Sequence, residues 1–271
     1  MRPNKKRLSL TVAIALMVLM AGCAGLVGGE DIEEDELEQK TLEAMEDVDT
    51  FSMTYNQSVE VMGTTSQMSA EGVIDREAQR AQMTTTMDGI PIEQYVIDDT
   101  LYQETGGEWV KVKLPEEILW EEHETAQQQK ALEMGDLDIR ETTTFDGNDV
   151  YVVDIELDED ELADVVNDSD AGMDGGFEGE FRMDAFMDDV EFNDVRVTQY
   201  IDTDTYHVRY VNMSFEMETS MGPVTIELDM TLSDFNEDVD IELPPEAETA
   251  VDLDEWIADG FGDDFSDGYG H

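Results

Sequence analysis

The sequence has a single cysteine and few basic residues, and both shortages restrict what the protein can be. Cys23 stands alone in 271 residues, so no disulfide can form within the chain. Lysine and arginine number 14 against 69 aspartates and glutamates, and the formal net charge is -55. Such a field repels the phosphates of nucleic acid everywhere on the surface. We therefore exclude a nucleic-acid partner.

The hydrophobic run at the N-terminus is short. It extends from Leu8 to Met20, after a basic head at residues 2–7, and it ends in small residues. A helix needs roughly 20 apolar residues to span a bilayer of ~30 Å, so this run does not qualify. The pattern is typical of an export signal peptide, which we place at residues 1–22.

The end of this signal has a second feature. The sequence Met20-Ala21-Gly22-Cys23 resembles a lipobox, in which the signal is cut before a cysteine that carries a lipid. We predict that Cys23 is the lipid anchor, that residues 23–31 form a polar tether, and that the chain is held at the outer face of the cell membrane. An ordinary signal peptide that happens to contain a cysteine is the alternative.

Residues that usually carry catalysis or bind metals are scarce. His123, His207 and His271 are scattered, without HExxH or any paired-ligand spacing. No serine lies in a GxSxG motif, and no cysteine remains as a nucleophile if Cys23 is lipidated. Acidic residues are so abundant that carboxylate pairs arise by chance. We predict no enzymatic activity, no metal site and no cofactor.

High net charge with low hydrophobicity usually indicates disorder, but this chain has a second pattern. Apolar residues make up 40% of the sequence, and many of them alternate with polar ones. A folded β-rich protein with an acidic solvent face fits better. The shortage of lysine resembles the composition of proteins from salt-loving archaea, where molar salt screens charges to about 3 Å.

Apolar and polar residues alternate from Phe51 onward, with Phe51, Met53 and Tyr55 as the first apolar positions. A period of two residues is typical of a half-buried strand. Turn residues such as Asp88-Gly89 separate successive runs. Six runs joined by short turns predict an antiparallel meander. The predicted strands are 51–61, 68–74, 83–87, 90–97, 101–102 and 108–113.

The second half of the chain predicts five more strands. Residues 139–145 and 150–157 form a hairpin pattern, and three long strands follow at 190–201, 206–218 and 224–235. The last of these has the cleanest alternation.

Helical spacing predicts a helix at residues 32–48. Pro115 and a helix-forming composition predict a second at 116–132, and acidic residues at a helix start predict a third at 158–166. A sheet of this size twists and curls. The predicted fold is α+β: a single curled antiparallel sheet of about eleven strands, a half-open β-barrel, with three helices covering its concave face. The domain would span 32–243, and 244–271 would be an acidic, disordered tail after Pro244-Pro245.

This order of elements resembles the LolA/LolB-type carriers and the mycobacterial lipoproteins of the LprG and LppX kind. Thr100-Leu101-Tyr102, the Gly106-Gly107 turn and Glu108-Trp109-Val110-Lys111 are similar to a strand-turn-strand pattern common in related lipoproteins. The resemblance implies a lipoprotein that shelters a lipid or other hydrophobic molecule between sheet and helices. It assigns no individual ligand residue.

Methionine is frequent, with 17 residues, and many lie on the predicted strands. Flexible thioether side chains repack around irregular apolar shapes, as a lipid cavity requires, but they also fill ordinary cores. Both interpretations stay open. The predicted cavity residues are Met53, Tyr55, Met68, Met83, Phe215, Met217, Ile226 and Met230.

The sequence thus predicts a monomeric, membrane-anchored lipoprotein that binds or carries a hydrophobic ligand. The alternative is a surface interaction or sensory module with a solid core. Three Asn-X-Ser triplets are possible glycosylation sites. Asn56 and Asn212 lie in predicted strands, so the loop residue Asn167 is the favoured site.

Overall fold

The computed structural model describes residues 32–87, 89–105, 107–114, 131–157, 191–219, 222–253 and 255–256. Cys23, the signal peptide, the tether and Asn167 lie outside these residues. So does the helix predicted at 158–166. Of the helix predicted at 116–132, the structure describes only the end, where residues 131–134 are helical.

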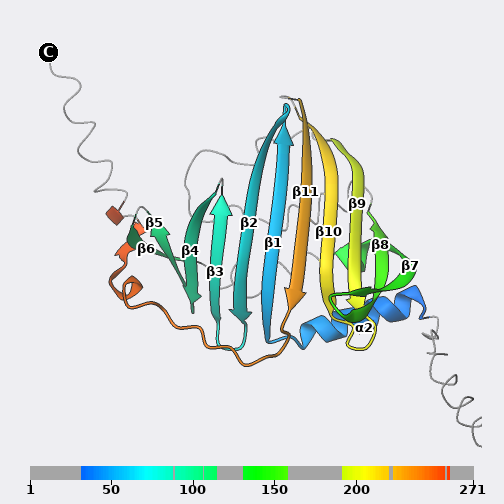
Figure 1. Cartoon of the computed structure of the whole chain (residues 1–271), viewed down its shortest axis with the longest axis horizontal. Helices are drawn as coiled ribbons and strands as arrows, with labels where there is room; N and C mark the ends of the chain where they lie inside the picture. The colour runs from blue at the N-terminus through cyan, green and yellow to red at the C-terminus, as the bar shows by residue number, and fades with distance from the viewer. Residues whose placement is uncertain are drawn as a thin grey trace, which may run out of the picture.

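The described chain builds one open sheet of twelve strands in the order β12-β6-β5-β4-β3-β2-β1-β11-β10-β9-β8-β7 (Figure 1). All neighbours pair antiparallel except β12, which pairs parallel with β6. The predicted single antiparallel sheet is confirmed, with β12 as an addition. The strands are β1 (Thr50–Val61), β2 (Thr64–Asp75), β3 (Arg80–Met87), β4 (Ile90–Ile97), β5 (Thr100–Thr105), β6 (Glu108–Lys113), β7 (Asp136–Phe145), β8 (Asn148–Glu156), β9 (Glu191–Asp202), β10 (Val208–Thr219), β11 (Gly222–Ser233) and β12 (Val251–Asp252).

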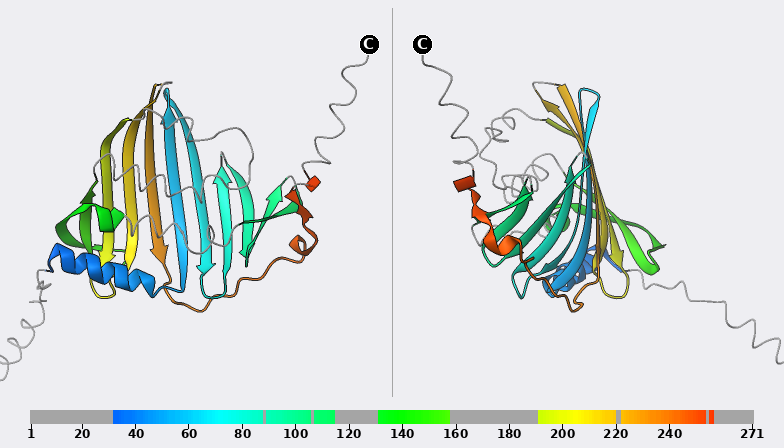
Figure 2. Two further views of the ribbon diagram at one scale, coloured as in Figure 1. Left: turned by 180° about the vertical axis from the view of Figure 1, so that it is seen from behind. Right: turned by 60° about the vertical axis from the view of Figure 1, so that its left-hand side comes forward.

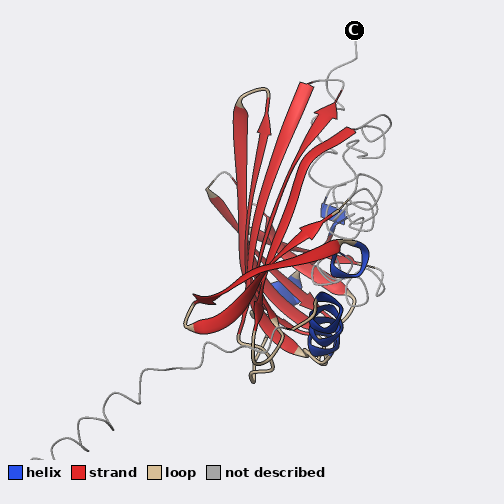
Figure 3. Cartoon of the chain, turned by 90° about the vertical axis from the view of Figure 1, so that its right-hand side faces the viewer, coloured by secondary structure: helices blue, strands red, loops and turns tan. Residues whose placement is uncertain are grey.

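Two complete helices are described, where three were predicted. The first is α2 (Glu34–Glu46), which confirms the helix expected near the start of the domain. The second is η2 (Ala247–Thr249), a short 3-10 helix that was not predicted. Leu37, Thr41 and Met45 form the buried stripe of α2. Figure 3 shows α2 on one side of the sheet, near the ends of the strands.

The side chains of the sheet divide into two faces, and strand register shows which residues share a face. Met53 pairs with Leu232 on β11 and with Gly72 on β2, and Gly72 pairs with Met83 on β3. Residues paired in this way point to the same side. Met53 and Leu232 belong to the same core cluster as Leu37 and Met45 of α2. We call this side the helix-covered face and the other the outer face. The sheet is strongly twisted and curled (Figure 2).

The C-terminal segment corrects the predicted domain boundary. Residues 244–252 were expected in a disordered tail, but Ala247 and Ala250 are buried, and Val251 pairs with Val110 of β6. Arg80 Nη1 also donates a hydrogen bond to the carbonyl oxygen of Ile241 at 2.7 Å. The segment, drawn in orange in Figure 1, runs past the strand ends to the β6 edge. Prolines interrupt regular structure, yet the free edge of a sheet still favours a pairing partner.

The end of α2 is held to the sheet by a positive charge. Arg76, in the turn after β2, donates from Nη1 to the carbonyl oxygens of Val48 at 3.0 Å and Met45 at 3.4 Å. Its guanidinium also lies over the ring of Phe51, 5.9 Å from the centroid. A cation at a helix C-terminus is favourable because the last carbonyls lack partners within the helix.

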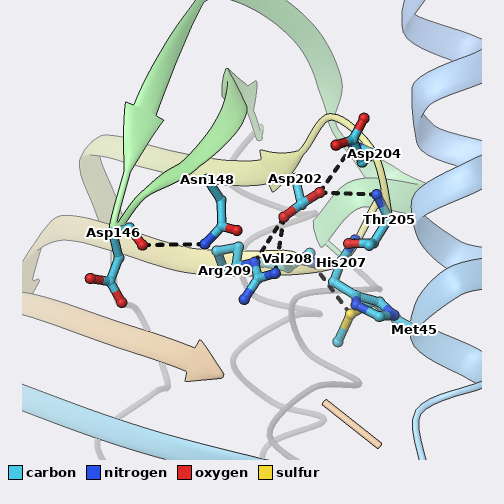
Figure 4. Close-up of polar contacts among 9 residues, drawn as sticks. All are labelled: Met45, Asp146, Asn148, Asp202, Asp204, Thr205, His207, Val208 and Arg209. Carbon is cyan, nitrogen blue, oxygen red and sulfur yellow. Dashed lines mark hydrogen bonds and ion pairs between the residues drawn. The ribbon is translucent and has the colours of Figure 1, made fainter. Parts of the chain in front are cut away.

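The β9–β10 turn holds the same helix from the other side (Figure 4). The backbone N–H of Val208 donates to Sδ of Met45 at 3.4 Å, and Lys40 Nζ donates to the hydroxyl of Tyr206 at 3.2 Å. The His207 ring packs on Phe235, with centroids 4.4 Å apart. The position of α2 therefore depends on contacts with several strands.

Candidate ligand-binding face

The helix-covered face is free of charge across the middle of the sheet. From β5 through β4, β3, β2 and β1 to β11, its alternating positions hold no aspartate, glutamate, lysine or arginine. In a chain with 69 acidic residues this is a strong segregation. The outer face of the same strands carries Glu60, Glu71, Asp75, Arg80, Glu93, Glu104, Glu227 and Asp229.

All eight residues predicted to line a cavity lie on this face, as register shows. Tyr55 pairs with Met230, Met68 with Met87, and Phe215 with Ile226. They differ in exposure. Five are buried and three are half-buried; the buried ones are Met53, Phe215, Met217, Ile226 and Met230, and the half-buried ones are Tyr55, Met68 and Met83.

Seven of the eight candidates belong to the core cluster or pack against it, including the half-buried Tyr55 and Met83. Met53 and Met230 are buried members of the core cluster that also contains Leu37 and Met45 of α2. Met68 is not a member of this cluster. Beside it on β3 and β4, Met87 is 51% exposed and Ile90 is 66% exposed. The helix-covered face thus changes from a packed core to an accessible apolar surface.

Sequence reasoning missed a row of four polar residues on this face. We call these residues, Thr85, Gln94, Gln103 and Thr105, the amide ladder. Thr85 Oγ1 donates to Gln94 Oε1 at 3.1 Å, Gln94 Nε2 donates to Gln103 Oε1 at 3.1 Å, and Gln103 Nε2 donates to Thr105 Oγ1 at 3.2 Å. All four side chains are half-buried. A signal was present in the sequence, because both glutamines occupy positions that the alternation assigns to the apolar face.

On the outer face, behind the ladder, a second network joins β3, β4 and β6. Gln82 Nε2 donates to the hydroxyl of Tyr95 at 3.0 Å, and this hydroxyl donates to Glu93 Oε1 at 2.8 Å. The Tyr95 ring lies 5.9 Å from that of Trp109. Burial and the neighbouring Glu93 raise the pKa of Tyr95 to about 12, so its hydroxyl keeps its proton at neutral pH. These contacts hold in place the strands that carry the ladder.

The part of the chain that the structure describes contains neither a metal-binding cluster nor a membrane-spanning helix. Nowhere in it do three or more His, Cys, Asp or Glu side chains come together in a group able to hold a metal ion. None of its helices has the length and apolar character required to cross a membrane.

The open, curled sheet with a helix on its uncharged face is a fold of the LppX type. Residues 33–252 match the model of a family of unknown function, DUF6612, and the chain belongs to this family. The match ends at Asp252, which is also the last residue of β12. No curated protein sequence matches the chain.

Three solved structures are similar to this chain to different degrees. The lipoprotein LppX of Mycobacterium tuberculosis is similar with a TM-score of 0.50 and 13% identity over 78% of this chain and 100% of that one. LprF of Mycobacterium bovis has a TM-score of 0.47 and 16% identity over 78% of this chain and 96% of its own. A LolA superfamily protein of Nitrosomonas europaea has a TM-score of 0.25 and 8% identity over 79% and 96%. The similarity to LppX confirms the resemblance for the fold.

Proposed function

We propose that the protein is a membrane-anchored, extracytoplasmic lipoprotein that binds or carries a lipid or other hydrophobic ligand between its sheet and helices. The observation that carries this proposal is the uncharged helix-covered face, which persists from β5 to β11 in a chain of net charge -55. A solvated sheet face in such a protein has no reason to lack acids. Removal of apolar surface from water is favourable by about 25 cal/mol per Å², so a hydrophobic ligand would be retained there.

The side chains of the accessible part suit such a ligand. Tyr55, Met68 and Met83 are half-buried, and Met87 is exposed. Unbranched methionine side chains adapt to irregular apolar shapes at little cost. The anchor would be a lipid on Cys23, in its lipobox-like sequence. This lipid would attach the domain to the outer face of the membrane. The function proposed is binding without catalysis.

A direct experiment is to purify the mature protein in molar salt, extract it with organic solvent and identify any bound lipid by mass spectrometry. We expect a hydrophobic molecule in stoichiometric amount. Met68→Trp should fill the accessible part of the helix-covered face and reduce the bound amount. Gln67→Trp is the matched control, because Gln67 is the next residue on β2 and is exposed on the outer face. Its lipid content should equal that of the wild type.

The alternative is a solid module that binds another protein. It gains support from the five predicted cavity residues that are buried. Protein that repeatedly carries no lipid, cannot be loaded with one, and is unaffected by Met68→Trp would favour this alternative and contradict the proposed function.

A further inference from the structure

We infer that the ligand is an uncharged amphiphile, a lipid whose hydroxyl, ester or other carbonyl group lies on the amide ladder while its hydrocarbon lies along the methionine-rich strands. This inference rests on the proposed function and names the chemical class of its ligand. It depends on three observations: the arrangement of the ladder, its unused hydrogen-bonding capacity, and the distribution of charge.

The amide ladder adjoins the apolar surface without a break. One row of paired residues crosses the sheet from β11 to β6 on the helix-covered face. The row consists of Leu232, Met53, Gly72, Met83, Gln94, Gln103 and Val110. Gly72 has no side chain, and a methyl group added there would come within 2.6 Å of Met83 Cγ. Met83 therefore lies close against β2, between the core and the glutamines.

The ladder has hydrogen-bonding groups to spare. A primary amide carries two N–H donors and an oxygen with two lone pairs. Gln94 and Gln103 each use one N–H and one lone pair within the ladder. If both amide groups were turned by 180°, the same number of N–H donors and lone pairs would remain unused. Covering such groups with pure hydrocarbon costs free energy, because a buried polar group without a partner loses its bond to water. A ligand with oxygen acceptors or a hydroxyl avoids this cost.

The charge distribution decides between a neutral and an anionic head. None of the described lysine or arginine side chains lies on the helix-covered face from β5 to β11. A phosphate placed on the ladder would lack a counter-charge among the described residues. An ion removed from water without a partner is strongly disfavoured. The head group that fits is polar and uncharged.

The test uses three probes that compete with bound Nile red on the delipidated mature protein in molar salt. They are dioleoylglycerol, which is neutral and carries a hydroxyl and esters; dioleoylphosphatidylglycerol, which has the same chains and an anionic head; and squalane, a pure hydrocarbon. We expect dioleoylglycerol to compete at concentrations about tenfold lower than either of the others, the range that one or two hydrogen bonds supply.

The double variant Gln94→Leu with Gln103→Leu removes the amides and keeps side-chain volume. We expect it to weaken dioleoylglycerol about tenfold and to leave squalane unchanged or stronger. Gln67→Leu, on the outer face, is the control and should bind like the wild type. Circular dichroism and thermal unfolding verify that each variant is folded.

The possible failures are distinct. Equal competition by all three probes, or a double variant that binds dioleoylglycerol like the wild type, overturns the neutral-amphiphile inference and leaves the proposed function standing. Preference for the phospholipid overturns it as well. A wild-type protein that binds neither Nile red nor any probe overturns the proposed function itself.

Discussion

Arg209 Nε donates a hydrogen bond to one carboxylate oxygen of Asp202 at 3.1 Å, and Arg209 Nη2 forms an ion pair with the same oxygen at 3.0 Å. The other oxygen accepts the backbone N–H groups of Thr205 at 2.9 Å and Asp204 at 3.0 Å (Figure 4). Burial alone would raise the pKa of Asp202, but the two N–H groups and Arg209 outweigh it, and the pKa lies below its ordinary value. One side chain thus closes the β9–β10 turn that holds α2.

Asp202→Asn should lower the free energy of unfolding by about 1.5–3 kcal/mol, the cost of losing a hydrogen bond to a charged group. The side chains of Asp202 and Arg209 are only 6% and 20% exposed, so water can hardly solvate the groups that lose the Asp202 carboxylate as their partner. Urea unfolding in molar salt at neutral pH measures this loss.

Asp99→Asn is the matched control for this prediction. It removes the same charge from a pair with Lys113, joined at 2.7 Å, in which the side chains are 43% and 77% exposed. Solvent and salt screen such a pair, so little change is expected. Equal losses in the two variants would show that burial of the Asp202 pair is irrelevant to its contribution.

His207 should make the stability of the fold depend on pH. Burial, and after it Arg209, lower the pKa of His207 below 6.5, against a smaller opposite effect of Asp202. Above the ordinary pKa the His207 ring is neutral in both the folded and the unfolded chain, so its full contribution to the free energy of unfolding is present. As the pH falls through about 6.5 toward the lower folded-state value, the unfolded chain binds a proton that the folded chain does not, and stability is lost.

The measurement is the unfolding temperature of the wild type and of His207→Gln between about pH 7.5 and pH 5.5, a window above the titration of most carboxylates. The wild type should lose more stability than the variant over this range. Parallel curves would rule out His207 as the source of the pH dependence.

Two arginines hold different segments, and their removal should loosen different parts of the molecule. Arg76→Met frees the carbonyl oxygens of Met45 and Val48, so amide hydrogen exchange should accelerate in α2. Arg80→Met frees the carbonyl oxygen of Ile241, so exchange should accelerate in residues 236–252. Each variant controls for the other. Acceleration spread evenly over the sheet in both variants would contradict this assignment.

Much of the fold could be predicted because alternation carries two kinds of information. In β1 the order Phe51, Met53, Tyr55 indicated a strand and also fixed which side chains share a face. For this reason all eight cavity candidates lie together on the helix-covered face. The pattern does not show which residues of this face join the buried core. Met53 and Met68 therefore looked equivalent in sequence, although only Met53 belongs to the core cluster that contains residues of α2.

The parts that sequence reasoning missed depend on distant partners. β12 has two residues, too few for any period, and it forms because Val251 meets Val110 at an otherwise free edge. Gln94 and Gln103 could not be predicted from the apolar pattern, because that pattern singles out only hydrophobic side chains. Their contact is visible only once β4 and β5 are paired in register.

Replacing Cys23 tests the anchor without disturbing the described fold. Acyl chains hold a protein to a bilayer through burial of hydrocarbon, about 0.8 kcal/mol per CH₂ group, and stable anchoring takes more than one chain or a second signal. The chain has a net charge of -55, so electrostatic attraction to anionic lipids cannot supply that second signal. Cys23→Ser should therefore move the protein from the membrane fraction to the medium.

Ala24→Ser, one residue further on, is the control, because it keeps the thiol. This variant should stay on the membrane, where detergent extracts it and salt does not. A wild-type protein found in the medium with an unmodified Cys23 would favour the ordinary signal peptide.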